Sequence, residues 1–407
     1  MSAGDDILPV ALPAIGSPLE VFRVFLKLGL TSFGGPVAHI GYFRDELVVR
    51  RKWIDEAGYA DLVALCQFLP GPASSQVGFS LGTLRGNGLL GGLAAWLAFT
   101  MPSAAVLFVF ALGAAALTGP TAEGFLHGLK LVAVAVVAQA IWGMSRSLTP
   151  DRTRAGIALA AVGIVVFVGG SFGQISALAF GAGAGARLCR GEVSALSGGL
   201  KFPVSRASGA LALLLFAAFL LLALATSDAS QQAVALFAAF YRSGALVFGG
   251  GHVVLPLLQA EVVTPGWATN ESFLAGYGLA QAVPGPLFTF AAYLGAVVGP
   301  TPNGLAGATI ALIAVFLPGL LLVYGTLPFW AALRMRPTAQ ALMRGANAAV
   351  VGILGAALYS PVWTSAILTP PDFALALAGF LLLTVWKAQP WIVVVLLGVG
   401  GTLLHSA

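Results

Sequence analysis

Long apolar stretches separated by short polar segments dominate the chain. They lie within residues 88–118, 154–169, 207–226, 372–386 and 389–404. Each approaches or reaches the ~20 residues that a helix needs to cross a bilayer. A transmembrane β-barrel would instead alternate apolar and polar residues in ~10-residue strands, and no such period runs through the sequence. The pattern therefore predicts an all-α polytopic membrane protein.

Composition and charge agree with this prediction. The 407 residues are 58% hydrophobic and 9% charged, whereas a soluble domain carries ~25% charged residues. The net charge of +5 comes from Lys and Arg gathered in a few connecting segments, which is typical of membrane orientation rather than of nucleic-acid binding. Cys66 and Cys189 lack CxxC spacing, so we expect no disulfide, metal site or cofactor and no nucleic-acid partner.

An ordered series of matches divides the chain into two copies of one unit. Phe33-Gly34-Gly35 returns as Phe248-Gly249-Gly250 at a spacing of 215, and Pro70-Gly71-Pro72 returns as Pro284-Gly285-Pro286 at 214. Further matched pairs are Lys27 with Arg242, Glu46 with Glu261, and Gln67 with Gln281. Such drift by only one or two residues indicates an internal duplication. We expect an N-terminal tail at 1–17, a first repeat at 18–190, a linker with one transmembrane helix at 191–231, and a second repeat at 232–407.

The charges of the loops predict that the second repeat is inverted relative to the first. Basic residues of the first copy gather at 44–52, 85, 146–154 and 187–206. The counterpart of the first basic loop holds Glu261 and Glu271 without Lys or Arg, and the positive charge moves to 334–344. Because positive loops mark the cytoplasmic side, and one linker span reverses the orientation of the second copy, the repeats should have opposite topology. The count stays open at nine spans if the segments with FGG and PGP are re-entrant, or thirteen if they cross.

The Gly/Pro clusters predict broken helices. Proline removes a backbone donor and glycine relaxes the backbone, so Gly34-Gly35-Pro36 and Pro70-Gly71-Pro72 should interrupt their helices, as should their counterparts in copy two. Paired interruptions in two repeats point to a transport site at the repeat interface, although the same clusters would also serve as packing kinks. A helix that resumes after a break suits an anion. Ser74 and Ser75 follow the first PGP and could supply hydroxyl donors, so we expect stronger contacts in copy one.

Ionisable side chains at membrane depth are candidates for charge balance and coupling. Lys27 and Arg242 would offset the charge of a dianion, unless Lys27 and Arg23 snorkel to the interface. Glu46 and Glu261 would carry a coupling proton, unless they are loop charges beside Arg44 and Arg50. The candidate substrate-binding residues are Lys27, Gly34, Gly35, His39, Pro70, Gly71, Ser74, Ser75, Arg242, Gly249, Gly250 and Gly285. The candidate coupling or gating residues are Arg23, Arg44, Glu46, Gln67, His252, Glu261 and Gln281.

Two segments resemble the chromate transporter family in its long, two-domain form. They are FLKLGLTSFGGPVAHIGYFRDELVVRRKWI at 25–54 with QFLPGP at 67–72, and their second-copy versions YRSGALVFGGGHVVLPLL at 241–258 and QAVPGP at 281–286. The resemblance covers nearly the whole chain. It implies export of chromate across the bacterial inner membrane, driven by the membrane gradient, with sulfate as the structural analogue. It also points to Pro36, Pro72, Pro284 and Pro286 beside the candidates above.

The expected partners are an oxyanion, the lipid bilayer, a coupling proton and a second copy in a homodimer. A passive anion channel and a sulfate importer remain alternatives. A membrane enzyme acting on a phosphorylated lipid is a weaker one, because it would need clustered His, Asp or Glu, and the ionisable residues here are scattered. No GxxxxGK[ST] motif occurs, so ATP hydrolysis by this chain is not expected.

Overall fold

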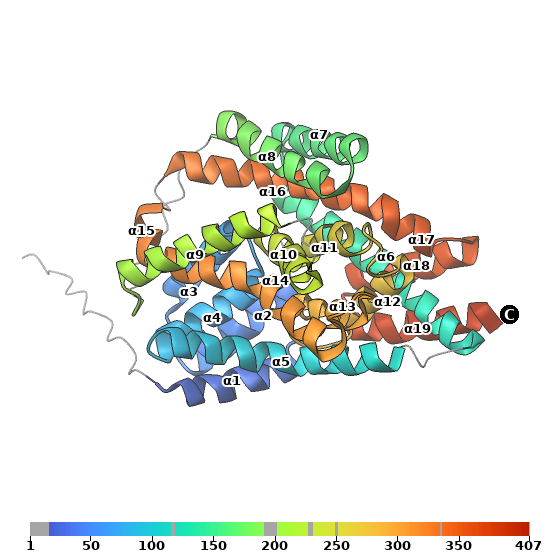
Figure 1. Ribbon diagram of the computed structural model, residues 1–407, viewed down its shortest axis with the longest axis horizontal. Helices are drawn as coiled ribbons and strands as arrows, with labels where there is room; N and C mark the ends of the chain where they lie inside the picture. The colour runs from blue at the N-terminus through green and yellow to red at the C-terminus, as the bar shows by residue number, and fades with distance from the viewer. Residues whose placement is uncertain are drawn as a thin grey trace, which may run out of the picture.

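The computed structural model describes residues 16–114, 119–190, 202–226, 231–248, 251–333 and 336–406, and every regular element in these residues is a helix (Figure 1). The first repeat contains α1 (Pro18–Thr31), α2 (Gly35–Phe43), the π-helix η1 (Arg44–Arg50), α3 (Glu56–Phe68), α4 (Ala73–Arg85), α5 (Leu89–Ala114), α6 (Pro120–Leu148), α7 (Arg152–Val168) and α8 (Gly170–Leu188). The linker forms α9 (Arg206–Ala225).

The second repeat follows the same order with more interruptions. It contains α10 (Gln232–Ala245), the 3-10 turn η2 (Gly251–Val253), α11 (Val254–Val262), α12 (Asn270–Ala280), η3 (Leu287–Thr289), α13 (Phe290–Val297), α14 (Gly304–Thr326), η4 (Leu327–Phe329), α15 (Trp330–Leu333), α16 (Pro337–Ala357), η5 (Leu358–Trp363), α17 (Thr364–Ala366), α18 (Pro370–Thr384) and α19 (Pro390–Ser406).

Local sequence signals determine where several helices begin. The side chains of Ser17, Asp55 and Asp151 each accept a hydrogen bond from a backbone N–H in the first turn of α1, α3 and α7. Such a cap satisfies one of the donors that a helix start leaves unpaired. Thr369 and Asp372 form a capping box at the start of α18. These polar residues determine where α1, α3, α7 and α18 begin.

Five helices among the described residues are long and apolar enough to cross a membrane. They are Leu89–Gly113, Pro120–Leu148, Arg206–Ala225, Gly304–Phe329 and Pro337–Ala366. The count of nine or thirteen spans stays a prediction, because this measure takes only single long helices. Among the other helices, α7 with α8 and α18 with α19 form two hairpins, with 15 to 19 residues in each helix.

Each of the two hairpins packs against a helix of the other repeat. The α7–α8 hairpin of the first repeat packs on α16 of the second, and α18–α19 of the second packs on α6 of the first (Figure 1). Glycines allow the closest approach: Gly181 and Gly185 meet Gly345, and Gly128 meets Gly398. Small residues at such contacts let helix backbones approach closely within a membrane. Reciprocal packing of this kind makes one body of the two repeats.

We expect Gly345→Ala to destabilise the α8–α16 contact. A Cβ atom at Gly345 would lie 2.1 Å from the carbonyl oxygen of Gly181 and 2.5 Å from the Cα of Gly185. Overpacking of this kind typically lowers stability by about 1–3 kcal/mol. Thermal unfolding of the detergent-solubilised protein measures the effect. Gly355→Ala on the same helix is the matched control, because a Cβ there meets nothing within 4 Å. Equal melting temperatures for the two variants would contradict the packing described.

Candidate functional site

The helices break where the Gly/Pro clusters predicted. α1 ends at Thr31 and α2 begins at Gly35, while α3 ends at Phe68 and α4 begins at Ala73. In the second repeat α10 ends at Ala245 and α12 ends at Ala280, ahead of the corresponding motifs. Gly34, Gly71 and Gly285 have φ of 98°, 123° and 96°, a region that side-chain-bearing residues rarely adopt. Gly249 and Gly250 lie outside the described residues.

Each PGP loop bonds to the residue before FGG in the other repeat. The N–H of Gly71 donates to the carbonyl of Val247 at 2.7 Å, and the N–H of Gly285 donates to the carbonyl of Ser32 at 2.9 Å. Val247 is the counterpart of Ser32 at the repeat spacing, so the two bonds are equivalent. Backbone groups freed by the breaks are thus satisfied across the repeat interface, as unwound backbone within a membrane requires.

The close contacts around the two PGP loops are also equivalent in the two repeats. A Cβ at Gly71 would lie 3.0 Å from the Cα of Gly319, and one at Gly285 would lie 2.9 Å from Oγ of Ser103. Ser103 and Gly319 are themselves counterparts at a spacing of 216. Near the FGG motifs, a Cβ at Gly251 would lie 3.1 Å from Cγ of Pro36. The interrupted segments of both repeats therefore converge on one region.

A buried histidine connects two interruptions of the first repeat. Nδ1 of His39 lies 3.3 Å from Oγ of Ser74, and its Nε2 lies 3.1 Å from the carbonyl oxygen of Ser32. His39 is 0% exposed, and its ring packs edge-on against Phe99 of α5, with ring centroids 5.2 Å apart. Because Nε2 faces a carbonyl oxygen, it is the nitrogen that donates. Nδ1 of the neutral ring can then accept a hydrogen bond from the Ser74 hydroxyl.

Several buried polar atoms after α1, on α4 and on α5 have no partner in the described part of the chain. The Oγ atoms of Ser32 and Ser75, Oγ1 of Thr100 and Oε1 of Gln76 are buried and have no hydrogen-bond partner among the described residues. Buried polar groups are nearly always paired, so these are places where a ligand or water would bind. Ser74 and Ser75 occupy the first turn of α4, where backbone N–H groups are also unpaired.

The second repeat replaces this cluster with apolar side chains. Ser32, His39, Ser74 and Thr100 correspond to Val247, Val254, Phe288 and Phe316, respectively. Thr289 replaces Ser75, but its hydroxyl donates to the carbonyl of Pro286 at 2.7 Å. The two repeats therefore share a backbone arrangement and differ in chemistry, because the free hydroxyl groups described above belong to the first repeat.

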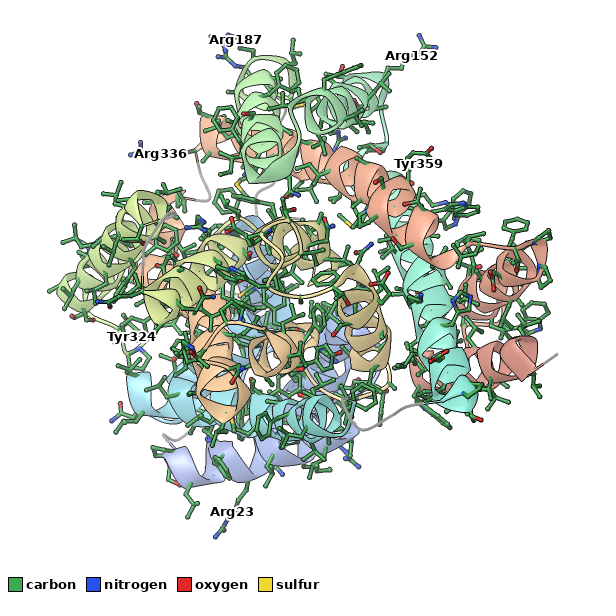
Figure 2. The ribbon with its side chains drawn as sticks, turned by 45° about the vertical axis from the view of Figure 1, so that its right-hand side comes forward. Arg23, Arg152, Arg187, Tyr324, Arg336 and Tyr359 are labelled. Carbon is green, nitrogen blue, oxygen red and sulfur yellow. The ribbon has the colours of Figure 1, made fainter. Side chains whose placement is uncertain are left out.

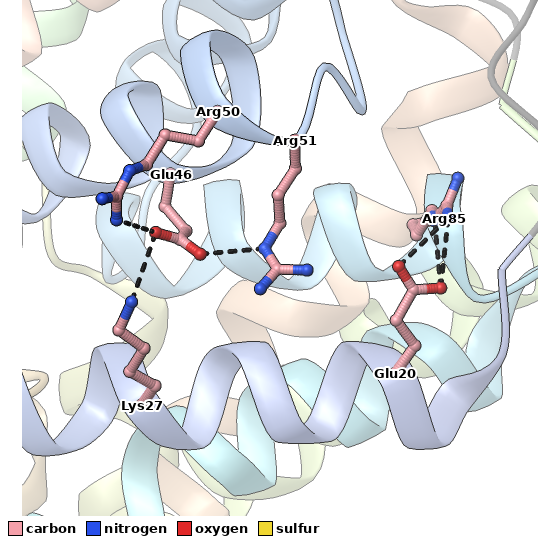
Figure 3. A network of polar contacts seen from close by, with 6 residues as sticks. All are labelled: Glu20, Lys27, Glu46, Arg50, Arg51 and Arg85. Carbon is pink, nitrogen blue, oxygen red and sulfur yellow. Dashed lines mark hydrogen bonds and ion pairs between the residues drawn. The ribbon is translucent and has the colours of Figure 1, made fainter.

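Lys27 and Glu46 belong to an ionic network near the surface (Figure 3). Nζ of Lys27 is 3.5 Å from Oε2 of Glu46, and Arg50 and Arg51 bond the same carboxylate at 3.2 and 2.8 Å. Burial raises the pKa of Glu46, but the contacts with Arg51, Arg50 and Lys27 outweigh this and hold the pKa below its ordinary value. The Lys27 side chain is 57% exposed, so Lys27 lies near the surface, where its sequence alternative of snorkelling to the interface would also place it.

Arg242 and Glu261, the counterparts of Lys27 and Glu46, form an ion pair that is buried. Their side chains are 9% and 11% exposed. Nε of Arg242 donates to Oε1 of Glu261 at 3.1 Å, and its Nη2 bonds the other carboxylate oxygen. Nη1 donates to the carbonyl of Ala223 in α9. One cation–carboxylate pair thus occurs in both repeats, in an exposed form in the first and a buried form in the second.

The other candidates have environments of their own. Arg23 projects outward from α1 (Figure 2), and Arg44 is exposed and bonds Glu56 at 2.6 Å. Nδ1 of His252 lies 2.8 Å from the hydroxyl of Tyr277. Gln67 is exposed, while Nε2 of Gln281 is buried without a partner among the described residues. No three His, Cys, Asp or Glu side chains of the described chain gather as a metal site would require.

Sequence reasoning missed several residues that the structure places at these sites. Gln76 braces the first PGP loop, because its Nε2 donates to the carbonyls of Pro70 and Gly319 at 2.9 and 3.0 Å. Ser32 and Thr100 were also missed. The available signal was their replacement by apolar residues at matched positions of the second copy. His127 and Asp372, which bond at 2.8 Å across 245 residues of chain, left no such signal.

Comparisons with known proteins give the family. The family model described as chromate transporter matches residues 19–186 and 234–402. The chain belongs to the chromate transporter family. It is 31% identical to a chromate transport protein of Pseudomonas aeruginosa over 98% of this chain and 95% of the relative. It is 30% identical to a probable chromate transport protein of Synechococcus elongatus, over 88% and 87% of the two chains.

A relative from Cupriavidus metallidurans, also named a chromate transport protein, is 29% identical over 92% of this chain and 90% of its own. No solved structure matches. The family match covers both repeats, and five helices are suited to cross the bilayer. The protein is therefore a multi-pass membrane protein of an ion-transporting family.

Proposed function

We propose that this protein exports chromate across the bacterial inner membrane by secondary transport, and that sulfate competes as the structural analogue. The observation that carries the proposal is the set of buried hydroxyls without partners at Ser32, Ser75 and Thr100, beside helix breaks bonded across the two repeats. The names of the full-length relatives supply the anion.

The anion would bind at the start of α4. A tetrahedral oxyanion presents acceptor oxygens in several directions, which the unpaired N–H groups and hydroxyls of the first turn can meet. The helix dipole adds partial positive charge there. The hydroxyl of Ser74 donates to Nδ1 of His39 in this structure, and it would rotate to donate to the anion instead when the anion binds. Donors without full charge suit a substrate that must leave again, because conduction and transport require binding that is not too tight.

We propose inverted topology for the two repeats as the basis of alternating access. The reciprocal bonds of Gly71 with Val247 and of Gly285 with Ser32 support a two-fold relation between the copies, as does the exchange of the α7–α8 and α18–α19 hairpins. In transporters with inverted repeats, rocking of one repeat against the other exposes a central site to each side in turn. Homodimer formation remains an expectation from the sequence.

Flux measurements on the purified protein in liposomes test the proposal. Chromate should accumulate against its own concentration gradient when a proton gradient is imposed, and an uncoupler should abolish the accumulation because it removes the driving force. Excess sulfate should slow the uptake of chromate. Empty liposomes are the control. Flux that only runs down the chromate gradient and ignores the uncoupler would instead favour a passive channel, and sulfate uptake without chromate uptake would favour a sulfate importer.

A further inference from the structure

A small cavity borders the buried ion pair of the second repeat. It is lined by Gln174, Ile175, Arg242, Ser243, Leu246, Leu257 and Glu261. Gln174 comes from α8 of the first repeat, whereas the charged pair comes from α10 and α11 of the second. Arg242 also reaches the linker helix through the carbonyl of Ala223. The cavity thus lies where both repeats meet, beside a residue that also contacts the linker, and Ser32, Ser75 and Thr100 are not among its lining residues.

The side-chain oxygen of Gln174 receives no hydrogen bond from the described residues. Its Nε2 donates to the carbonyl of Pro256 at 2.9 Å, which determines the orientation of the amide. Oε1 is then the free atom, and it is buried without a hydrogen-bond partner among the described residues, in a residue that is 6% exposed. A buried acceptor without a donor is unfavourable, so the Gln174 oxygen favours a state of the cavity in which a donor reaches it.

We propose that Glu261 is the binding site of the coupling proton. An ionised carboxylate only accepts hydrogen bonds, whereas a protonated one carries an O–H donor. When Glu261 takes up a proton, its new O–H can donate to Oε1 of Gln174 across the shared cavity. The inference rests on the proposed gradient-driven transport and names the residue at which its driving ion binds.

Protonation of Glu261 would remove the negative charge that is paired with Arg242. The ionised pair balances two charges at membrane depth, and removal of one charge leaves a buried cation without its counter-ion, which is strongly unfavourable. Arg242 would keep its bond to the carbonyl of Ala223 in α9, but the protonated carboxyl group would offer it an uncharged acceptor in place of a counter-ion. α10 must then move relative to α11, or Arg242 must meet another anion. Proton binding is thereby linked to the conformation of the second repeat and of the linker.

Other charged groups on the elements packed against α11 are engaged elsewhere or lie at the surface. His252 of η2 bonds Tyr277, and Arg344 of α16 donates to the carbonyl of Cys189. Glu271 of α12 and Arg187 of α8 are exposed. Arg242 is the cation that pairs with Glu261 among the described residues. The first-repeat counterpart, Glu46, contacts Lys27, Arg50 and Arg51 instead, which favours its ionised form.

The experiment measures proton and chromate fluxes together in liposomes that contain a pH-sensitive dye. For the unaltered protein, chromate flux should be accompanied by proton flux. Glu261→Gln cannot titrate, so it should lose proton-driven chromate accumulation and the accompanying proton flux, while chromate–chromate counterflow stays measurable. Gln174→Leu leaves the ion pair intact and removes the acceptor, so it should reduce proton coupling. Glu271→Gln is the control and should behave like the unaltered protein.

The outcomes separate this inference from the proposed function. No chromate flux by the unaltered protein would defeat the proposed function. Proton-coupled flux by the unaltered protein that persists in Glu261→Gln would overturn the inference alone, and so would loss of coupling in Glu46→Gln with coupling retained in Glu261→Gln. If Glu261→Gln fails to fold because Arg242 is left unpaired, the double variant Arg242→Gln with Glu261→Gln removes both charges. Retained proton coupling in that double variant would equally overturn the proposal.

Discussion

Replacement of Ser74 and Ser75 together by alanine should raise the chromate concentration needed for half-maximal transport at least tenfold. A hydrogen bond to a charged group contributes about 1.5–3 kcal/mol, and about 1.4 kcal/mol corresponds to a factor of ten. The Ser75 hydroxyl has no partner in the described structure, so no structural bond is lost with it. Initial rates of chromate uptake into liposomes measure the change.

Thr289→Ala is the matched control for the serine pair. Thr289 occupies the position of Ser75 in the second repeat, and its hydroxyl is already bonded to the carbonyl of Pro286. We expect this variant to transport chromate with an unchanged half-maximal concentration. Equal effects of the double serine variant and of Thr289→Ala would contradict an anion site built by the first repeat. Melting temperatures of both proteins show whether a loss of transport reflects a loss of folding.

Gly71→Ala should abolish transport and lower the melting temperature. The φ of 123° at Gly71 is strained for any side-chain-bearing residue, by about 1–3 kcal/mol. The new Cβ would also lie 2.9 Å from Nε2 of Gln76 and 3.0 Å from the Cα of Gly319. Relief of these contacts displaces the loop and breaks the hydrogen bond to Val247. Flux in liposomes and thermal unfolding in detergent measure the two consequences.

Gly285 is the equivalent position in the second repeat, and Gly41 serves as a control glycine without close contacts. Gly285→Ala should resemble Gly71→Ala, because its φ is 96° and its Cβ would lie 2.9 Å from Oγ of Ser103. Gly41→Ala in α2 should have no effect, since a Cβ there meets nothing within 4 Å. Transport and melting of Gly71→Ala that match those of Gly41→Ala would show that the PGP loop does not depend on close backbone contact across the repeats.

Much of the architecture could be predicted from short stretches of the sequence. Apolar runs predicted helices near their observed bounds, as for α9, and Gly/Pro clusters predicted the break between α3 and α4. These predictions succeed because helix length, caps and proline breaks depend on neighbouring residues. The matched spacing of Lys27 with Arg242 and of Glu46 with Glu261 also singled out the residues that form ion pairs in both repeats.

The sequence by itself determined the helical membrane class, the duplication and the positions of the breaks, because each depends on short-range pattern. Only the tertiary structure decided that Lys27 is exposed while Arg242 is buried, that Gln76 braces the PGP loop, and that Gln174 of the first repeat and Glu261 of the second line one cavity. Such outcomes depend on which surfaces meet over hundreds of residues. Equivalent positions in two repeats share a backbone, but their burial is set by neighbours that differ between the copies.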